Sequence, residues 1–379
     1  MSKREMISLF KVFMSNDVDQ PLLETLHSGY VGEGLKVLEF EESLKKKLQT
    51  NNVLTTNSGT SALHLAYHLA LNRNKPKDYQ DHSSECIITT PVTCTATNNP
   101  IIHNGCRIKW ADVDPITGNI SIDSIKKIFN PKEDVAISIV HWGGNPCDIE
   151  KIADFAKKNN IKLIEDGAHS LGMLYKEKPF GFYSDYAVHS FQAIKHITSV
   201  DGGCLICKNS EDYERAKLLR WYGIDRTIID GVDLRCEQDI KEAGYKFHMN
   251  DICAVIGNEN LKHLDEILTI QRENAKFYDE AFSGKIRFAH ENKNGRSSYW
   301  LYTIHIENRD ELMEKLKEKG IMTSKVHSRN DTHTMFMEYK TNLPGVNSFS
   351  RTHLCIPVGW WVTKEDREYI AEQVLKYAR

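Results

Sequence analysis

The sequence predicts an α/β protein with a mostly parallel sheet between helices, followed by a smaller α+β part. Two observations predict it. Over the first two thirds of the 379 residues, short apolar runs alternate with segments of helical periodicity, which is typical of parallel strands joined by helices. After Met249 a long helical stretch precedes one strand-like run and two helices. We therefore expect a large domain over residues 1–260 and a smaller C-terminal α+β domain over residues 261–379.

The apolar runs of the first part are too short for helices in this setting, so we interpret them as strands. We expect seven of them, at residues 53–56, 85–91, 107–113, 134–142, 161–168, 186–191 and 203–208. Because helical segments separate most of them, we expect neighbouring strands to run parallel, with helices on both faces of the sheet.

Helical periodicity and capping residues predict the helices. One follows the first strand at residues 60–71, and another occupies 148–160 with Asp148 as N-cap. Residues 250–282 form a long helical connector in this interpretation. A strand at 297–306 and two helices complete the smaller domain. These helices are expected at 310–320, where Gly320 ends the first, and at 364–378.

Composition and charge exclude several classes of function. Lys plus Arg number 49 and Asp plus Glu number 52, so the net charge of −3 argues against a nucleic-acid binder. No apolar run approaches the length of about 18 residues that a membrane span needs. The N-terminal MSKREMISLFKVF lacks the apolar core of a signal peptide, so we expect a cytoplasmic protein. No second Cys-x-x-Cys accompanies Cys204 and Cys207, so we expect no metal site.

The segment TNSGTSALHLA at residues 56–66 joins the first strand to a helix. Gly59, Thr60 and Ser61 stand at the helix N-terminus, where free N–H groups and the helix dipole can bind a phosphate. An ordinary N-capped helix is the alternative interpretation. The segment lacks the Gly-Lys-Ser/Thr of a Walker loop and the GxGxxG of a dinucleotide-binding turn.

The segment IKLIEDGAHS at residues 161–170 places Asp166 at the carboxyl end of a strand, where open α/β sheets bind ligands. Its carboxylate either caps a helix or holds a proton on the ring nitrogen of a cofactor such as pyridoxal phosphate. His169 follows three residues later and could flank the same ring.

The segment HSFQAIKHITSVDGGCLI at residues 189–206 places Lys195 in a loop with apolar neighbours, Ile194 and Ile197. A lysine shielded from water has a lowered pKa and can act as nucleophile and base. A solvated loop lysine is the alternative. Ser190, five residues earlier, could donate a hydrogen bond to a phosphate.

Together these segments resemble the DegT/StrS family of pyridoxal-phosphate-dependent nucleotide-sugar aminotransferases, on the fold-type I aminotransferase scaffold. EDGAHSLG (165–172) followed by the SFxxxK pattern (190–195) and its glycine pair carry the resemblance. GYVGEGLKVLEFE (29–41), NSGTSAL (57–63), TCTATNNPI (93–101) and GYKFHMNDICAVIG (244–257) extend it over nearly the whole chain.

The resemblance implies a role for each motif residue. Lys195 would attach the cofactor covalently and move protons, Asp166 would pair with its pyridinium nitrogen, and His169 would lie near its ring hydroxyl. The residues implied to bind the phosphate are Gly59, Thr60, Ser61 and Ser190. The family shares each site between two subunits, which implies a homodimer.

Two positions depart from the family pattern. Cys94 stands where the family usually stacks an aromatic side chain on the cofactor, so a thiol or another side chain would cover the ring. Lys246 stands where the family often has an asparagine that reaches the phosphate of the partner subunit. We hypothesise that Lys246 replaces this contact as a point charge; a solvated lysine is the alternative.

Candidates for sugar-nucleotide binding come from three segments. Tyr30 and Glu33 lie in the glycine-rich GYVGEG, which lines the substrate mouth in the family. Two arginines near WYGID could reach a pyrophosphate, and three residues of VHSRNDTH fall where the family contacts substrate from the small domain. These five residues are Arg220, Arg226, His327, Arg329 and His333.

The expected reaction has two halves. L-glutamate would leave as 2-oxoglutarate after converting the cofactor to pyridoxamine phosphate, which would then aminate a nucleotide-linked 4-keto-6-deoxyhexose to the 4-amino-4,6-dideoxy sugar. Amination at C3 is one alternative. A sugar 3-dehydratase would carry His in place of Lys195, whereas here His196 is its neighbour. A non-catalytic pyridoxal-phosphate sensor or scaffold, and a dinucleotide-dependent oxidoreductase, are further alternatives.

Overall fold

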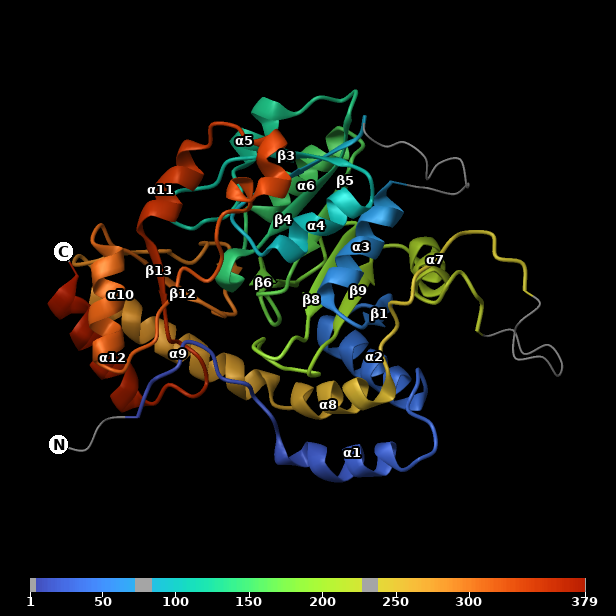
Figure 1. Ribbon diagram of the computed structural model, residues 1–379, viewed down its shortest axis with the longest axis horizontal. Helices are drawn as coiled ribbons and strands as arrows, with labels where there is room; N and C mark the ends of the chain where they lie inside the picture. Colours follow the sequence, from blue (N-terminus) through green and yellow to red (C-terminus); the bar gives the residue numbers. More distant parts are fainter. Residues whose placement is uncertain (1–4, 72–83, 227–237, 379) are drawn as a thin grey trace.

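A seven-stranded sheet forms the centre of the protein (Figure 1). The computed structural model describes residues 5–71, 84–226 and 238–378. In spatial order the strands are β1 (Val53–Thr56), β9 (Gly203–Cys207), β8 (Tyr186–Ser190), β5 (Lys162–Asp166), β4 (Asp134–Val140), β2 (Cys86–Thr89) and β3 (Arg107–Trp110). Each of the seven predicted runs contains one of these strands.

The sheet is mostly parallel, as predicted. The five strands from β3 to β8 pair in parallel, while β9 runs antiparallel to both of its neighbours, β8 and β1. Asp166 pairs with Val188, Ser190 pairs with Gly203, and Gly203 pairs with Thr56. The carboxyl ends of β1, β5 and β8 therefore meet at one edge of the sheet.

Alternate strand residues face opposite sides of the sheet and enter different hydrophobic clusters. Leu54, Val188 and Leu205 pack against α3 (Gly59–Ala70), while Val53 and Ala187 pack against α2 (Leu35–Leu48) and α8 (Asp251–Leu261). On that second face, α6 (Ile149–Lys158) covers β4 and β5. Helices therefore cover both faces, as the alternating pattern predicted.

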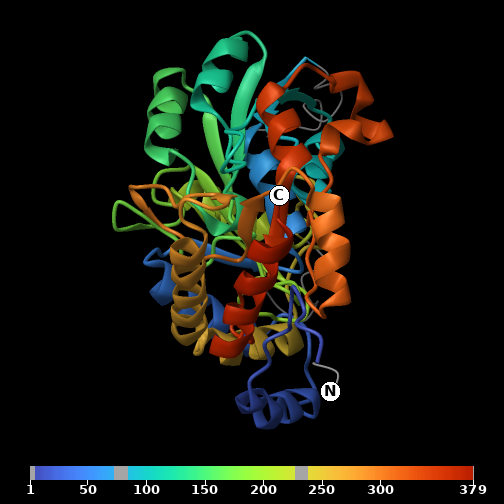
Figure 2. The same ribbon diagram turned by 90° about the vertical axis from the view of Figure 1, so that its left-hand side faces the viewer.

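The C-terminal part contains a three-stranded antiparallel sheet flanked by helices. Its strands are β10 (Arg287–Phe288), β12 (Tyr302–His305) and β13 (His353–Ile356), and its helices are α9 (Leu264–Phe282), α10 (Arg309–Glu318), α11 (Pro344–Thr352) and α12 (Lys364–Tyr377). Figure 2 shows α9 and α12 side by side, as their packing requires.

The remaining elements connect these layers. They are the helices α1 (Asp19–Leu26), α4 (Thr95–His103), α5 (Ile122–Ile128) and α7 (Ser210–Arg220), the 3-10 turns η1 (Asn16–Val18), η3 (Trp142–Gly144), η4 (Asn330–Thr332) and η5 (Thr334–Tyr339), and the short strands β6 (Leu174–Tyr175), β7 (Lys178–Pro179) and β11 (Gly295–Arg296).

Two predicted elements were wrong in extent. The helix expected over 250–282 is broken between α8 and α9, where Lys262 and His263 cap the two helices. The strand expected over 297–306 is confined to 302–305. The chain before it turns at Tyr299, whose φ of 48° lies in the left-handed region, and directs the next residue, Trp300, towards the large sheet.

The two ends of the chain pack against each other. Ile7 forms a parallel bridge with Ile321, and it joins the cluster that includes Ile304 and Ile370. Trp300 packs into the same cluster as Leu54 of the large sheet. The division into domains 1–260 and 261–379 stays a prediction.

None of the helices among the described residues has the length and apolar character that crossing a membrane requires.

Candidate active site

A cavity of about 340 Å³ opens where β1, β5 and β8 end. It gathers eight of the residues singled out in the sequence: Gly59, Thr60, Cys94, Asp166, His169, Ser190, Lys195 and His327. They come from five segments of the chain, at residues 59–60, 94, 166–169, 190–195 and 327. The register of the sheet brings three of these segments, which follow β1, β5 and β8, to one edge. The segments that carry Gly59, Asp166 and Lys195 therefore converge on one site.

Asp166 is buried at the end of β5, and both carboxylate oxygens have donors. Thr97 Oγ1 donates to Oδ2 at 2.7 Å, and the backbone N–H of Ala168 donates to Oδ1 at 3.0 Å. Burial raises the pKa of Asp166, and the two hydrogen bonds oppose this rise. A buried carboxylate held in this way can face a positively charged ring nitrogen.

Lys195 lies in the turn between β8 and β9, with its amine inside the cavity. Burial of the amine lowers the pKa of Lys195 to about 8, although Asp166 and Cys94 oppose this shift. With this pKa, on the order of a tenth of the amine is an unprotonated nucleophile at pH 7. A solvated lysine would have shown no such shift.

His169 and His327 lie parallel in the wall of the cavity, with ring centroids 5.6 Å apart. Burial lowers the pKa of His169 well below its usual range and that of His327 to about 4, so both rings are neutral at physiological pH. Nδ1 of His169 and Nε2 of His327 are buried without a hydrogen-bond partner among the described residues. Such unpaired polar atoms suit a bound polar ligand.

A strained turn presents His327 to the cavity. The N–H of His327 donates to the carbonyl oxygen of Lys325 at 2.7 Å, which makes a γ-turn centred on Val326. Val326 has a φ of 63°, a conformation that β-branched residues rarely adopt. Strain of this kind persists where the surrounding structure over-determines it, as at binding sites.

The N-terminus of α3 forms a narrow corner of the cavity. A Cβ added to Gly59 would lie 2.9 Å from Cβ of Ser190, so only glycine leaves room here. Ser61 does not line the cavity, because its hydroxyl donates to Oδ1 of Asn57 at 2.6 Å and contacts the capping Ser58. Gly59, Thr60 and Ser190 are left to receive an anion.

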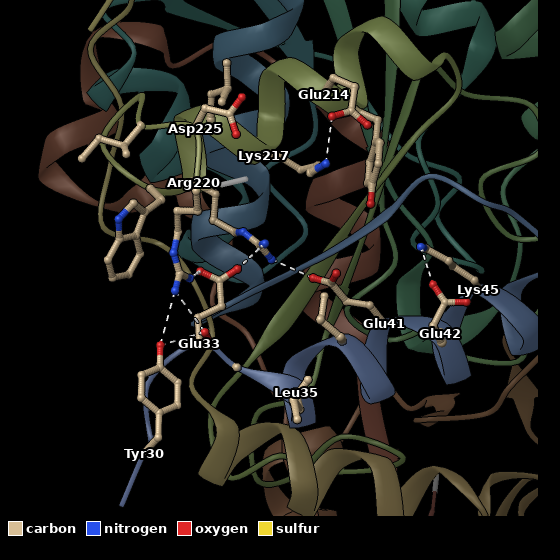
Figure 3. Close-up of a pocket in the computed structure, with 17 residues that line it drawn as sticks. Tyr30, Glu33, Leu35, Glu41, Glu42, Lys45, Glu214, Lys217, Arg220 and Asp225 are labelled. Carbon is tan, nitrogen blue, oxygen red and sulfur yellow. Dashed lines mark hydrogen bonds and ion pairs between the residues drawn. The ribbon is translucent and has the colours of Figure 1, made fainter. Parts of the chain in front are cut away.

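Four predicted substrate residues gather in a different cavity, between α2 and α7 (Figure 3). Arg220 is buried between Glu33 and Glu41, and its Nη1 also donates to the carbonyl oxygen of Thr55. Arg226 pairs with Glu33 and contacts the hydroxyl of Tyr30. Within one subunit, these side chains bind one another and lie outside the cavity that holds Lys195.

The other three predicted residues line neither cavity. Arg329 forms a bidentate ion pair with Asp331 and donates to Asn347. His333 caps η5 and lines neither cavity. The side chain of Lys246 is exposed, and its carbonyl oxygen accepts from Asn57, two residues before Gly59. The ammonium group of Lys246 therefore lies outside the cavity of its own subunit.

Several lining residues were missed by the sequence interpretation, among them Phe10, Thr97 and Trp300. Thr97 lies within the motif TCTATNNPI, and its spacing of one helical turn from Thr93 was a usable signal. Trp300 was hidden in a run interpreted as a strand, and Phe10 lies in an N-terminal segment that carries no motif.

Ligand-type side chains also cluster at the far edge of the sheet, where Cys86, Glu133 and Asp134 come together. The ammonium of Lys109 already pairs with Glu133 at 2.7 Å and with Asp134 at 2.8 Å. The guanidinium of Arg107 also pairs with Glu133 at 2.8 Å, so two protein cations balance the two carboxylates.

Comparisons with known proteins point to one family. The model of the DegT/DnrJ/EryC1/StrS aminotransferase family matches residues 14–375. A transaminase of Campylobacter jejuni, named for UDP-4-amino-4,6-dideoxy-N-acetyl-beta-L-altrosamine, is 30% identical over 95% of both chains. Two crystal structures superpose with TM-scores of 0.92. AtS13 from Actinomadura melliaura is 37% identical over 98% of this chain and 99% of its own, and the sugar aminotransferase CalS13 from Micromonospora echinospora is 34% identical over 98% and 100%.

The side chains that line the cavity fit pyridoxal phosphate, independently of the comparisons with known proteins. It offers a lysine amine, a buried carboxylate, two unpaired histidine nitrogens and a helix N-terminus where no side chain fills the corner beside Ser190. These groups match an aldehyde, a basic ring nitrogen, a polar ring substituent and a phosphate in turn.

Proposed function

Because the chain belongs to the DegT/DnrJ/EryC1/StrS aminotransferase family, whose members depend on pyridoxal 5'-phosphate, we propose that it aminates a nucleotide-linked 4-keto-6-deoxyhexose with L-glutamate as donor. It is a sugar aminotransferase. The observation that carries the proposal is the convergence of Lys195 and Asp166 on one buried cavity. Amination at C4 is favoured because the name of the Campylobacter relative contains a 4-amino-4,6-dideoxy sugar.

In this proposal the residues of the cavity hold the cofactor as follows. Asp166 pairs with the ring nitrogen, His169 contacts the ring hydroxyl, and Lys195 provides the attachment point. Gly59, Thr60 and Ser190 bind the phosphate. When bound, the cofactor supplies an electron-withdrawing ring that makes the α-hydrogen of an attached amine acidic.

Lys195 is the proton carrier. A base works best when its pKa lies near the operating pH, and burial brings the pKa of this amine to about 8. Because burial lowers the pKa values of His169 and His327, their rings are weaker bases than the amine of Lys195. Apolar lining from Leu63, Val140 and Ile194 excludes water from the reacting atoms.

The alternatives have less support. His196 donates from Nε2 to the carbonyl oxygen of Ser298 at 3.0 Å and does not line the cavity, so it is not placed as the base of a dehydratase. A non-catalytic sensor would not need the buried donors that hold Asp166. Amination at C3 differs only in how the sugar is held.

We further propose that two copies of the chain form a dimer in which Lys246 serves the phosphate of the partner. Its exposed position beside Asn57 supports this, as do Leu35 and Leu38, apolar side chains of α2 that are 73% and 57% exposed beside the cavity of Figure 3. The cytoplasmic location expected from the sequence stays a prediction.

The test is an absorption titration. Pyridoxal phosphate is added to the purified protein, followed by L-glutamate and then by a nucleotide-linked 4-keto-6-deoxyhexose. We expect a visible band that glutamate abolishes and the keto sugar restores, with 2-oxoglutarate released. The position of the new amine is read from the product by NMR, and Lys195→Arg is the control without a band. A visible band that glutamate does not abolish would contradict L-glutamate as the donor. An amine found at C3 of the product would contradict amination at C4.

Mixing inactive variants tests the shared site. If Lys246 serves the partner, a heterodimer of Lys195→Ala and Lys246→Ala subunits contains one site with both lysines intact. We expect the mixture to recover about a quarter of the wild-type activity at random exchange, because half of the dimers are mixed and each has one intact site. Activity no greater than that of Lys246→Ala alone would contradict the shared site.

A further inference from the structure

The amine of Lys195 rests on the face of an indole ring. Its Nζ lies 3.8 Å from the ring centroid of Trp300, and no carboxylate among the described residues lies within ion-pairing distance of it. Phe10 stacks against the same indole at 5.0 Å, and His169 stacks at 3.9 Å with its plane tilted by 19°. The indole is therefore held within a stack of rings at the wall of the cavity.

Hydrogen bonds tie the segment 298–300 to the chain on both sides of the lysine. Nε1 of Trp300 donates to the carbonyl oxygen of Ile194 at 2.9 Å, and Nε2 of His196 donates to the carbonyl oxygen of Ser298 at 3.0 Å. The two residues that flank Lys195 are thus both bonded to the segment 298–300. These bonds hold the backbone around Lys195 next to the segment 298–300, while the lysine side chain itself is restrained only by its contact with the indole.

The same segment also fixes the neighbouring histidine. Ser298 Oγ donates to the carbonyl oxygen of His169 at 2.9 Å, while the ring of His169 lies on Trp300. Gly144 permits this approach, because a Cβ there would lie 2.2 Å from Ser298 Oγ. Segment 298–300 therefore sets the position of the lysine amine and of the histidine ring together.

We propose that Trp300 is a positioning residue that holds the amine of Lys195 in the cavity whenever this amine is not attached to the cofactor. The proposal rests on the proposed function, in which the amine is released and then acts as a base. A released lysine side chain has many rotamers, and a fixed indole face selects the one that keeps the amine close to the reacting atoms.

The electrostatics of the indole match this role. The face of an indole attracts an ammonium and favours it over the neutral amine, most strongly where water is excluded. Burial favours the neutral amine instead. The indole thus lets Lys195 take up a proton inside the cavity without a carboxylate partner.

Fluorinated tryptophan at position 300 tests the proposal, because fluorine weakens the attraction of the ring for a cation with little change in its shape. The measured quantity is the rate at which added pyridoxal phosphate forms its visible band with cofactor-free, full-length protein, between pH 6 and 10. Borohydride reduction and peptide mapping then locate the bond on Lys195. The other titratable and charged groups around the amine stay the same across the series: Asp166, Cys94, His169, His196, Asp201 and His327.

We expect the midpoint of the rate profile to fall with each added fluorine, by about one pH unit over the series. The control carries the same substitutions at Trp361, whose Nε1 donates to the carbonyl oxygen of Ser8 outside the cavity, and its midpoint should not move. Repeating the series in a Cys94→Ser background removes any thiol ionisation from the profile.

The outcomes separate the two proposals. A midpoint that is the same for every ring at position 300, with the bond still formed on Lys195, would overturn the role of Trp300 and leave the proposed function standing. Absence of any bond on Lys195 in the unsubstituted protein would overturn both. A purely structural role for Trp300 predicts the first result, because the fluorinated rings pack alike.

Discussion

The hydroxyl of Thr97 donates a hydrogen bond of 2.7 Å to Oδ2 of Asp166 and is itself in contact with the hydroxyl of Thr93. This donor opposes the effect of burial on the carboxyl group. In Thr97→Val the carboxylate keeps only the N–H of Ala168, so its pKa rises further. We expect about a tenfold loss of pyridoxal phosphate affinity by absorption titration, which is about 1.4 kcal/mol. Thr97→Ser should retain the wild-type affinity, and equal losses in both variants would argue against the hydrogen bond as the cause.

Arg220 tests whether a predicted substrate residue is structural. In Arg220→Gln, Glu33 and Glu41 lose a buried cationic partner, so we expect unfolding to become easier by about 3–5 kcal/mol in urea titrations. Lys217→Gln, on the exposed side of the same helix, should cost less than about 1 kcal/mol. A stable Arg220→Gln protein with a raised KM for the sugar nucleotide would favour the substrate role instead.

Val326 tests whether the γ-turn stores strain. Val326→Gly removes the side chain that disfavours a φ of 63°, so we expect the free energy of unfolding to rise by about 1 kcal/mol. The released turn should also hold His327 less firmly and lower kcat. Val326→Ala retains a Cβ and is the matched control. If the alanine variant gains as much stability as the glycine variant, the strain is not in the backbone.

Glu242 should make the free energy of unfolding depend on pH. Burial opposes its ionisation, but hydrogen bonds from Arg215 and His68 outweigh burial and lower the pKa of Glu242 to about 2. A lowered folded-state pKa stabilises the fold above the unfolded value of 4.5, and this contribution is lost as the pH falls towards about 2. We expect Glu242→Gln to cost about 2–3 kcal/mol at pH 7 in urea titrations, and progressively less below pH 5.

The control for this experiment is Glu214→Gln, in an exposed pair with Lys217. It should cost less than about 0.5 kcal/mol at every pH. A cost of Glu242→Gln that is equally large at pH 7 and pH 3 would show that shape, and not charge, makes this side chain stabilising.

The fold could be predicted because its strands are continuous apolar runs. Both faces of β4 and β5 are covered, so their residues carry a signal that does not depend on partners far along the chain. Strands β6, β7, β10 and β11 have two residues each and leave no period to detect. The turn at Tyr299 was also invisible, since nothing in SSYWLYTIHI distinguishes a left-handed residue from a strand residue.

The site could be predicted where motif residues lie at strand ends, as Asp166 and Ser190 do. The arginines could not be placed in this way. Arg220 meets Glu33 and Glu41, which lie 187 and 179 residues earlier, and no local pattern announces such a partner. Trp300 is a similar case, because its role in the site depends on contact with Lys195, which is distant in the sequence.

The ring stack beside Lys195 combines Phe10, near the start of the chain, with Trp300, near its end. The stack can therefore form only after most of the chain has been synthesised. At roughly 5–20 residues per second, a ribosome needs on the order of 5–20 s to extend the chain from Lys195 to Trp300. During that interval the nascent chain contains the lysine but not yet the indole that lies beside it in the folded protein. A cofactor that reached Lys195 during synthesis would meet an incomplete cavity. We therefore expect the cofactor to bind correctly only after the chain is complete.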